Sequence, residues 1–267
     1  MFQRTIEKPI TIKGMGLHTG QLQKIKVFPA KADIGISFNG IRVSIESIQA
    51  ESGFTQIGRI ITIEHLLSSF AGLFIDNVAI HTMDTEVPIL DGSALPIVKL
   101  LHPVELNVKR HFICVQKPIW FEDANAKVGL LPSEKQIFDI EIDYHDTPAI
   151  GYMHERFELT EKAYREHIAP ARSFARISDI EFLQAHGKAI GASFNTGIAV
   201  KGDKILNPEG LRDPCEFIRH KILDAIGDMT TAGNTLLAEY RSIKGGHYHN
   251  NMLLKLLFSN LDNYQIV

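Results

Sequence analysis

The segment from Asp213 to Met229 reads DPCEFIRHKILDAIGDM, and it decides how the second half of the chain folds. Its apolar residues recur at the i, i+4, i+7, i+8 and i+11 spacing of one buried helical stripe, so the segment is predicted to be an α-helix. The stripe consists of Ile218, Ile222, Ala225, Ile226 and Met229. We expect the helix to begin at Asp213-Pro214-Cys215-Glu216, read as an N-cap, a proline at the first helical position and an acidic residue at the third.

His220 and Asp224 lie on a second face of this predicted helix. Residues four apart are neighbours on a helix surface, with about 5–6 Å between their Cβ atoms. An imidazole and a carboxylate at this spacing can therefore converge on one cation. Taken alone, such a pair is usually a solvated surface feature, so the prediction of a metal site depends on a third ligand from elsewhere.

A second helical segment, Thr62 to Phe74, reads TIEHLLSSFAGLF and offers that ligand. Its apolar stripe leaves Glu64, His65 and Ser68 on or beside the polar edge. Adjacent helical residues are about 100° apart, so His65 can bind a metal while Glu64 faces the attacking water. Imidazole suits zinc or ferrous iron, a catalytic zinc site needs three protein ligands and an open position, and a neighbouring glutamate is a sensible proton acceptor.

Several segments occur together in a recognisable order. They are Arg4-Thr5, Gly14–Gly20, Thr62–Leu67, Val87–Ala94, Phe217–Asp228 and Gly245-Gly246-His247. In these segments, from Arg4 to about Leu257, the chain resembles the UDP-3-O-acyl-N-acetylglucosamine deacetylases, the metal-dependent amidases of the committed step in lipid A synthesis.

The resemblance implies a role for each chemically competent group. His65, His220 and Asp224 would hold the metal, Glu64 would be the general base, and His247 would be the acid that protonates the departing amine. The cofactor implied is zinc, with ferrous iron as an alternative. An acetamide is a poor electrophile with a poor leaving group, so its hydrolysis requires an activated water, oxyanion stabilisation and a proton for nitrogen.

The family polarises the acetyl carbonyl with a threonine in an Arg-Thr-Phe segment, where this chain has Arg172-Ser173-Phe174. Ser173 keeps the hydroxyl but lacks the methyl group that restricts χ1, so we expect slower chemistry and not its loss. Lys221 is included among the catalytic groups because it would supply positive charge for sugar and diphosphate oxygens.

Substrate contacts follow from the same resemblance. Asp143 and Tyr144 stand where the family places an Asp-Phe pair against the uridine, and Lys244 would face the diphosphate. The segment around them is one residue longer than the family pattern, with His145 as the apparent insertion. An ordinary turn and solvated lysines are the competing interpretation.

An apolar passage for the acyl chain is expected from the region 174–199. Phe174 and Phe194 are predicted to contact substrate, and Phe182, Leu183 and Ile190 are further candidates for the passage. Each of these residues taken singly is more often an ordinary core residue. Asn195 stands where the family commonly has an acidic residue.

Two further histidines compete for roles. His18 lies in the glycine-rich run Gly14–Gly20, which lacks both the P-loop ending and dinucleotide-binding spacing, so a connection between early strands is predicted there. The resemblance places His18 near the mouth of the active site. His249 competes with His247 for the acid role, but the Gly-Gly-His match favours His247.

The predicted fold class is α+β, with two domains of similar fold and helices sandwiched between two β-sheets. The similarity of the two domains and the sandwich come from the resemblance, whereas the class comes from the pattern of elements. The domains are expected at residues 1–106 and 107–267, with Pro103–Arg110 as the linker. The expected strands are Ile34–Phe38, Asn77–His81, Phe112–Phe121, Lys127–Leu131 and Ile137–Tyr144, with a further helix at Ile180–His186.

Composition limits the partners. A chain of 267 residues with 45% hydrophobic residues can form real cores, and a net charge of −3 without a basic cluster argues against nucleic acid. The two cysteines, Cys114 and Cys215, exclude a disulfide framework. No signal sequence or apolar run of about 18 residues is present, so we expect a cytoplasmic protein with at most transient membrane-surface contact. A monomer is expected as a default and not from any feature of the sequence.

The predicted function is hydrolysis of the N-acetyl group of a UDP-linked, acylated amino sugar. Two alternatives stay open from the residues. One is a paralogous deacetylase acting on a different N-acetylated sugar nucleotide, suggested by Ser173, Asn195 and the insertion at His145. The other is a metal-binding regulator without activity, which is disfavoured because every catalytic position carries a competent group.

Overall fold

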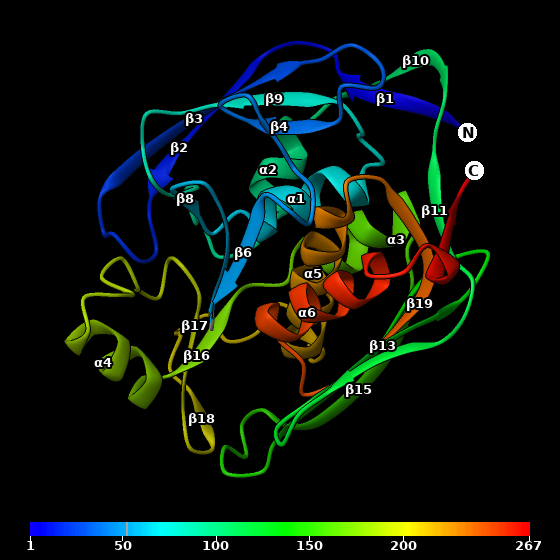
Figure 1. Ribbon diagram of the computed structural model, residues 1–267. Coiled ribbons are helices and arrows are strands. Elements are labelled where there is room, and N and C mark those ends of the chain that lie inside the picture. The colour runs from blue at the N-terminus through cyan, green and yellow to red at the C-terminus, as the bar shows by residue number, and fades with distance from the viewer. Residues whose placement is uncertain (52) are drawn as a thin grey trace.

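The computed structural model describes residues 1–51 and 53–267. Figure 1 shows helices α1 (Glu64–Gly72), α5 (Glu216–Met229) and α6 (His247–Phe258) between two β-sheets, one from each half of the chain. This arrangement confirms the predicted α+β class. Each sheet packs one face against these helices, so the helices are covered by a sheet on both sides.

The sheet of the first half has the strand order β2-β3-β9-β4-β5, with β4 parallel and β3 antiparallel to β9. In β3 the buried positions alternate with exposed ones through Gln23, Ile25 and Val27, the period of a strand with one face on the core. The elements of this half are β1 (Phe2–Ile6), β2 (Ile10–Met15), β3 (Leu22–Pro29), β4 (Ile36–Phe38), β5 (Ile41–Arg42), β6 (Ile48–Glu51), β7 (Phe54–Ile57), β8 (Ile60–Ile61), α1 (Glu64–Gly72), β9 (Val78–His81), α2 (Leu95–Leu100) and β10 (Pro103–Lys109).

The sheet of the second half is arranged around β19, which pairs with β13, β14 and β11. A smaller sheet, β16-β17-β18, carries helix α4 at its side (Figure 1). The elements are β11 (Phe112–Val115), β12 (Ile119–Glu122), β13 (Lys127–Pro132), β14 (Gln136–Tyr144), β15 (Gly151–Glu158), α3 (Glu161–Ala163), the π-helix η1 (Tyr164–Ile168), β16 (Phe174–Arg176), α4 (Ile177–Ala185), β17 (Ile198–Lys201), β18 (Lys204–Ile205), α5 (Glu216–Met229), the 3₁₀ helix η2 (Thr230–Ala232), β19 (Thr235–Ile243), α6 (His247–Phe258), the 3₁₀ helix η3 (Leu261–Asn263) and β20 (Tyr264–Ile266).

The structure corrects the predicted linker and one predicted strand. Pro103–Arg110 is not a free linker, because β10 pairs antiparallel with β1, and the expected domain boundary at 106/107 falls inside that strand. The predicted strand Phe112–Phe121 is two strands, β11 and β12. Pro118 lies in the break between them and cannot donate to a strand ladder.

Two details of the predicted helices are also different. Helix α5 begins at Glu216 with Cys215 as its N-cap, so Asp213 and Pro214 lie outside the helix. Asp213 still fixes the backbone just before the helix, because its side chain accepts a hydrogen bond from the Cys215 amide at 2.8 Å. In α1 the predicted polar edge is buried along with the apolar stripe, since α5 packs against it.

The other predicted elements are close to those observed. The glycine-rich run ends β2 and then forms the turn into β3, as predicted for a connection between early strands. Gly92, in the connection between β9 and α2, has a φ of +84°, a value that glycine adopts without a steric penalty. No described helix is long and apolar enough to cross a membrane.

Candidate active site

Three side chains predicted as metal ligands lie together between α1 and α5. Donor atoms of His65, His220 and Asp224 are all within 4.8 Å of one another, and all three residues are buried. The Nε2 atoms of His65 and His220 are 3.5 Å and 3.4 Å from Asp224 Oδ1. The structure therefore brings together one ligand from the first half of the chain and two from the second.

The two helices that carry these residues meet backbone to backbone. A Cβ atom on Gly227 would lie 2.1 Å from the carbonyl oxygen of Glu64, closer than atoms of folded proteins approach. Glycine at this position lets α5 lie directly against the start of α1. The separation between His65 and the His220–Asp224 pair is set by this crossing.

Gly227→Ala is expected to destabilise the protein by about 1–3 kcal/mol, because the added methyl group must push the two helices apart. In an exposed helix interior glycine is about 1 kcal/mol less favourable than alanine, so a glycine-to-alanine change there usually stabilises a protein. The change in stability expected for Gly227→Ala therefore has the opposite sign. Urea unfolding of both proteins measures the difference. Gly246→Ala is the matched control, since no atom of residues 1–51 and 53–267 outside its own neighbours lies within 4 Å of its Cβ position. Equal loss in both variants would contradict the helix-contact explanation.

His220 is held in the state that a ligand requires. Its Nδ1 lies 3.1 Å from the carbonyl oxygen of Ala171, which orients Nε2 toward the cluster when Nδ1 carries the proton. Burial lowers the pKa of His220 to about 4 against the opposing effect of Asp224. The imidazole is thus neutral at pH 7, with a free nitrogen lone pair.

Asp224 is ionised and partnered on two sides. Burial raises the pKa of its carboxyl group, but His220 and the Lys221 ammonium outweigh burial and hold the pKa well below the usual value. Lys221 Nζ lies 2.9 Å from Asp224 Oδ2. Lys221, predicted to face sugar and diphosphate oxygens, is therefore placed against a candidate metal ligand.

Glu64 is buried beside the cluster. Burial raises the pKa of its carboxyl group, with His247 and His65 acting in the opposite direction. Its Oε2 accepts a hydrogen bond from the Thr55 amide at 3.0 Å. A carboxylate in this position is a stronger proton acceptor than one in water.

His247, at the start of α6, is joined to a buried polar network. Its Nδ1 lies 2.7 Å from Asp228 Oδ2, and the same carboxylate accepts hydrogen bonds from Thr55 Oγ1 at 2.6 Å and Asn250 Nδ2 at 2.8 Å. Burial lowers the pKa of His247, but Asp228 outweighs it and raises the pKa to about 9. The imidazole is therefore protonated at neutral pH.

Sequence reasoning missed three members of this network: Asp228, Thr55 and Asn250. Asp228 had a signal, because it continues the i, i+4 series of His220 and Asp224 along the same helical face. Thr55 and Asn250 had none. Their positions beside Asp228 depend on the packing of β7 and α6 against α5.

The competing histidines are placed differently. His249 Nε2 lies 3.1 Å from the partly exposed Asp123, not in the Asp228 network. His18 is buried with its ring centroid 5.0 Å from that of Phe54. Neither ring nitrogen of His18 has a hydrogen-bond partner within the described part of the chain.

The aromatic residues predicted to contact substrate divide into two groups. The Phe174 ring lies 6.2 Å from the His220 ring and 5.8 Å from the Tyr144 ring, centroid to centroid, so both stand near the cluster. Phe182, in helix α4, is 65% exposed, and Phe194, after that helix, is 47% exposed. Figure 1 shows α4 away from α5. The structure brings the first group to the cluster and leaves the second at the surface.

The remaining predicted contacts are held by an ion pair and by hydrogen bonds. Asp143 Oδ2 lies 2.8 Å from Lys244 Nζ, and the hydrogen bond from Lys244 lowers the pKa of the carboxyl group. Ser173 is half-buried, and its backbone is fixed by hydrogen bonds to Gly92 and Ile198 at 2.7 Å each. The segment before it is anchored by Arg172, whose Nε donates to Glu216 Oε1 at 2.7 Å.

Comparison with known proteins agrees with this site. The family model for UDP-3-O-acyl N-acetylglycosamine deacetylase (LpxC) matches residues 3–259. A UDP-3-O-acyl-N-acetylglucosamine deacetylase of Sulfurovum sp. (strain NBC37-1) is 39% identical over 280 residues, which cover 100% of this chain and 95% of the relative. Proteins of the same name from Helicobacter hepaticus and Syntrophotalea carbinolica are 38% and 36% identical, covering 100% of this chain and 93% and 91% of the relatives. The chain belongs to the UDP-3-O-acyl N-acetylglycosamine deacetylase family.

Proposed function

We propose that the protein hydrolyses the N-acetyl group of UDP-3-O-(3-hydroxyacyl)-N-acetylglucosamine to the free amine and acetate, the committed step of lipid A biosynthesis. The observation that carries this proposal is the cluster of His65, His220 and Asp224, with Glu64 and His247 beside it, in a chain of this family. The relatives' names supply the substrate class. The groups around the cluster supply the chemistry.

The donor set fits a zinc ion. Two neutral imidazoles and one ionised carboxylate, with donor atoms within 4.8 Å of one another, are three ligands of the kind found in catalytic zinc sites. Ferrous iron accepts the same ligands, so the metal content of freshly purified protein decides between them. When bound, such an ion acts as a Lewis acid toward water and the acetyl carbonyl.

Glu64 and His247 divide the proton transfers. Glu64 accepts a proton from the water that attacks the acetyl carbon, and burial makes its carboxylate a stronger proton acceptor by raising the pKa of the carboxyl group. Protonated His247, oriented by Asp228, donates to the amide nitrogen as the C–N bond breaks. The cleavage gives the free amine and acetic acid, which releases its proton to solvent and becomes acetate, and the proton that Glu64 took from water replaces the one that His247 gave to nitrogen.

The acetyl oxygen is assigned to Ser173. Its hydroxyl can donate a hydrogen bond to the oxyanion that forms when water attacks. The fixed backbone around Ser173 supports this role, since hydrogen bonds from both sides hold the segment in place. Lys221 supports the site through Asp224.

The two ends of the substrate are assigned to opposite sides of the cluster. We assign the uridine to Tyr144 and Phe174, and the diphosphate to Lys244, whose charge is held by Asp143 until substrate arrives. The acyl chain is assigned to the α4 side, where Phe182, Ile190 and Phe194 are exposed in spite of their size. Exposed apolar groups of this kind mark binding surfaces.

The direct test is acetate release by the purified protein. Activity should disappear on treatment with a chelator and return on adding zinc or ferrous iron. Full activity after rigorous metal removal would contradict the proposal. Comparing the acylated substrate with UDP-N-acetylglucosamine separates this function from deacetylation of another sugar nucleotide.

The alkaline limb of the pH profile is expected near pH 9, because protonated His247 is lost as the pH rises through its pKa of about 9. Asp228→Asn removes the group that raises this pKa most, so burial, which lowers the pKa, is then opposed only by the weaker effects of Glu64 and Asp224. The limb should therefore move down by more than about one pH unit. The measurement is kcat/KM from pH 6 to 10.

Asp123→Asn is the matched control for this prediction, because it removes the carboxylate beside His249 instead. Its profile should match that of the unchanged protein. If Asp123→Asn moves the alkaline limb and Asp228→Asn does not, His249 is the acid and the assignment of His247 is wrong.

The organisation into domains 1–106 and 107–267 stays a prediction, supported by the origin of the two sheets in different halves of the chain. The monomeric state, the cytoplasmic location, the transient membrane contact and the absence of nucleic-acid partners also stay predictions. Sedimentation equilibrium of the purified protein tests the first of these four.

A further inference from the structure

A cavity of about 410 Å³ lies at the C-terminal ends of α1 and α5. Its lining comes from both halves of the chain and includes none of the proposed metal ligands or catalytic residues. Cavities that hold small molecules are typically about 300–1,000 Å³. The cavity is therefore large enough for a ligand and separate from the candidate active site.

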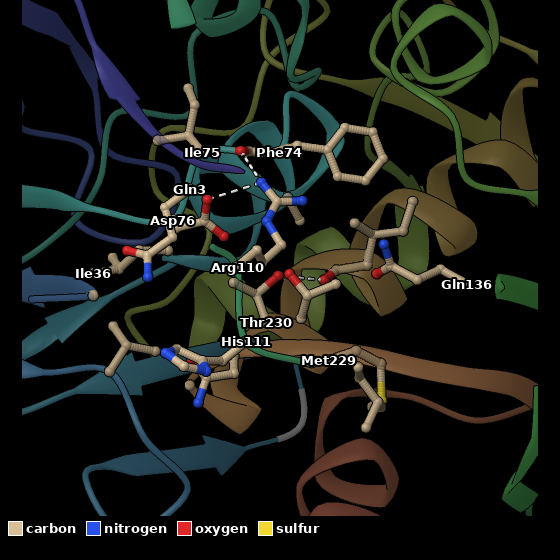
Figure 2. A pocket seen from close by; sticks show the side chains of 18 of the residues that line it. Gln3, Ile36, Phe74, Ile75, Asp76, Arg110, His111, Gln136, Met229 and Thr230 are labelled. Carbon is tan, nitrogen blue, oxygen red and sulfur yellow. Dashed lines mark hydrogen bonds and ion pairs between the residues drawn. The ribbon is translucent and has the colours of Figure 1, made fainter. Parts of the chain in front are cut away.

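One wall of the cavity carries two hydrogen-bonded groups of polar side chains, from the first half of the chain and the start of the second. Asp76 Oδ2 accepts from Arg110 at 2.8 Å, Asn77 donates to Gln3 at 2.9 Å, and Gln3 donates to Asp33 at 2.6 Å. Figure 2 shows Arg110 between Asp76 and Gln3 on one side and Gln136 on the other. The positions of these polar groups are thus fixed before any ligand enters.

Arg110 has a donor that the network does not use. Arg110 is only 5% exposed, and its guanidinium group donates to Asp76 and to the carbonyl of Phe74. Its Nε–H has no hydrogen-bond partner among the described residues. Because a buried donor without an acceptor is unfavourable, a ligand oxygen here would satisfy a group that the chain itself leaves unpaired.

The lining offers two guanidinium groups, of Arg110 and Arg42, to an anion. The Asp76 carboxylate is paired with Arg110, and Asp33 faces His111 at 3.7 Å. The exposed Arg42 guanidinium lies over Gly35 and forms no ion pair with a described side chain. Among the described lining residues, the Arg42 guanidinium is a charged group without an ion pair, whereas the Asp33 carboxylate accepts a hydrogen bond from the Gln3 amide at 2.6 Å.

The opposite wall is apolar and belongs to the second half. It is built from core residues of α5, β13, β14 and β19, namely Leu130, Phe138, Ile226, Met229, Leu236 and Ala238. An anionic head against Arg110 and Arg42, with an apolar body against this wall, would match both surfaces. A fully polar anion would leave the apolar wall in contact with water.

We propose that this cavity is a binding site for an amphiphilic monocarboxylate, a small molecule with one carboxylate head and an apolar body. The carboxylate accepts hydrogen bonds from Arg110 Nε and Arg42. The body lies between the C-terminal ends of α1 and α5. The site is distinct from the acyl passage assigned to the α4 side.

Octanoate, octanol and octylamine test the proposal with one chain length and three head groups. Isothermal titration of the full-length, metal-loaded protein should show saturable octanoate binding, with a Kd on the order of 10 µM to 1 mM for a ligand of this size. Octanol should bind more weakly and octylamine at least about tenfold more weakly, because only the carboxylate matches the free charge. Absence of octanoate binding, or equal binding of all three, overturns the proposal.

Three variants locate the binding. Arg42→Gln should raise the octanoate Kd by at least about fivefold, and Ala71→Leu should raise it by filling the cavity beside α1. Arg59→Gln, which removes an exposed arginine of the same half outside the cavity, should leave the Kd unchanged. Phe194→Ser should also leave it unchanged, and loss of octanoate binding in that variant would place the ligand in the acyl passage and overturn the proposal.

Discussion

Replacing Glu64 with glutamine should lower kcat by about 10²–10⁴, the usual contribution of general acid–base catalysis, while the protein keeps its metal. Glutamine has the shape of glutamate and can accept the Thr55 amide hydrogen bond at 3.0 Å, but it cannot take a proton from water. The measurement is steady-state kcat together with metal content by mass spectrometry.

Glu239→Gln is the control for this variant, because Glu239 lies on β19 and pairs with Arg156 at 2.8 Å, outside the cluster. It should have normal kcat. A Glu64→Gln protein with full kcat and full metal content would show that another group accepts the proton. One that has lost its metal would show that Glu64 is a ligand and not a base.

His65→Ala should lose both metal and turnover. The substitution removes the one candidate ligand from the first half of the chain and leaves two on α5. Changing a residue that only contacts a metal ligand typically lowers metal affinity by about 10–100-fold. Loss of a ligand itself should lower the affinity by more than about 10²-fold. Competition with a fluorescent chelator measures the affinity. Acetate release measures the turnover.

The matched control is His81→Ala, which removes an exposed histidine from β9 in the same half of the chain. Metal affinity and kcat should be unchanged in that protein. Tight metal binding by His65→Ala would exclude His65 as a ligand. Since one change should affect two measurements together, a loss of turnover alone would also count against the assignment.

The sequence predicted the parts of this site that a helical period can show. His220 and Asp224 are four apart on one face, so their convergence follows from helix geometry alone. Their approach to His65 was predicted through the family resemblance, because periodicity does not show which helices touch. The physical cause is Gly227, whose missing side chain lets α5 meet α1.

The sequence could not show the hydrogen-bonded surroundings. Thr55, on a short strand, reaches Asp228 on α5 only because β7 lies beside the helix crossing. Pro103–Arg110 was misread as a linker for a similar reason. Its pairing with β1 depends on residues almost a whole domain away in sequence, and strand pairing of that kind has no local signature.

The crossing of α1 and α5 also has a consequence for how the protein matures in the cell. During synthesis the N-terminal part of the chain emerges first, and at that stage His65 stands alone without the other two side chains of its cluster. Capture of the ion must wait until α5 has been made and has docked. Metal loading would then be among the last events of folding, and a metal-bearing molecule would be one whose two halves have already joined.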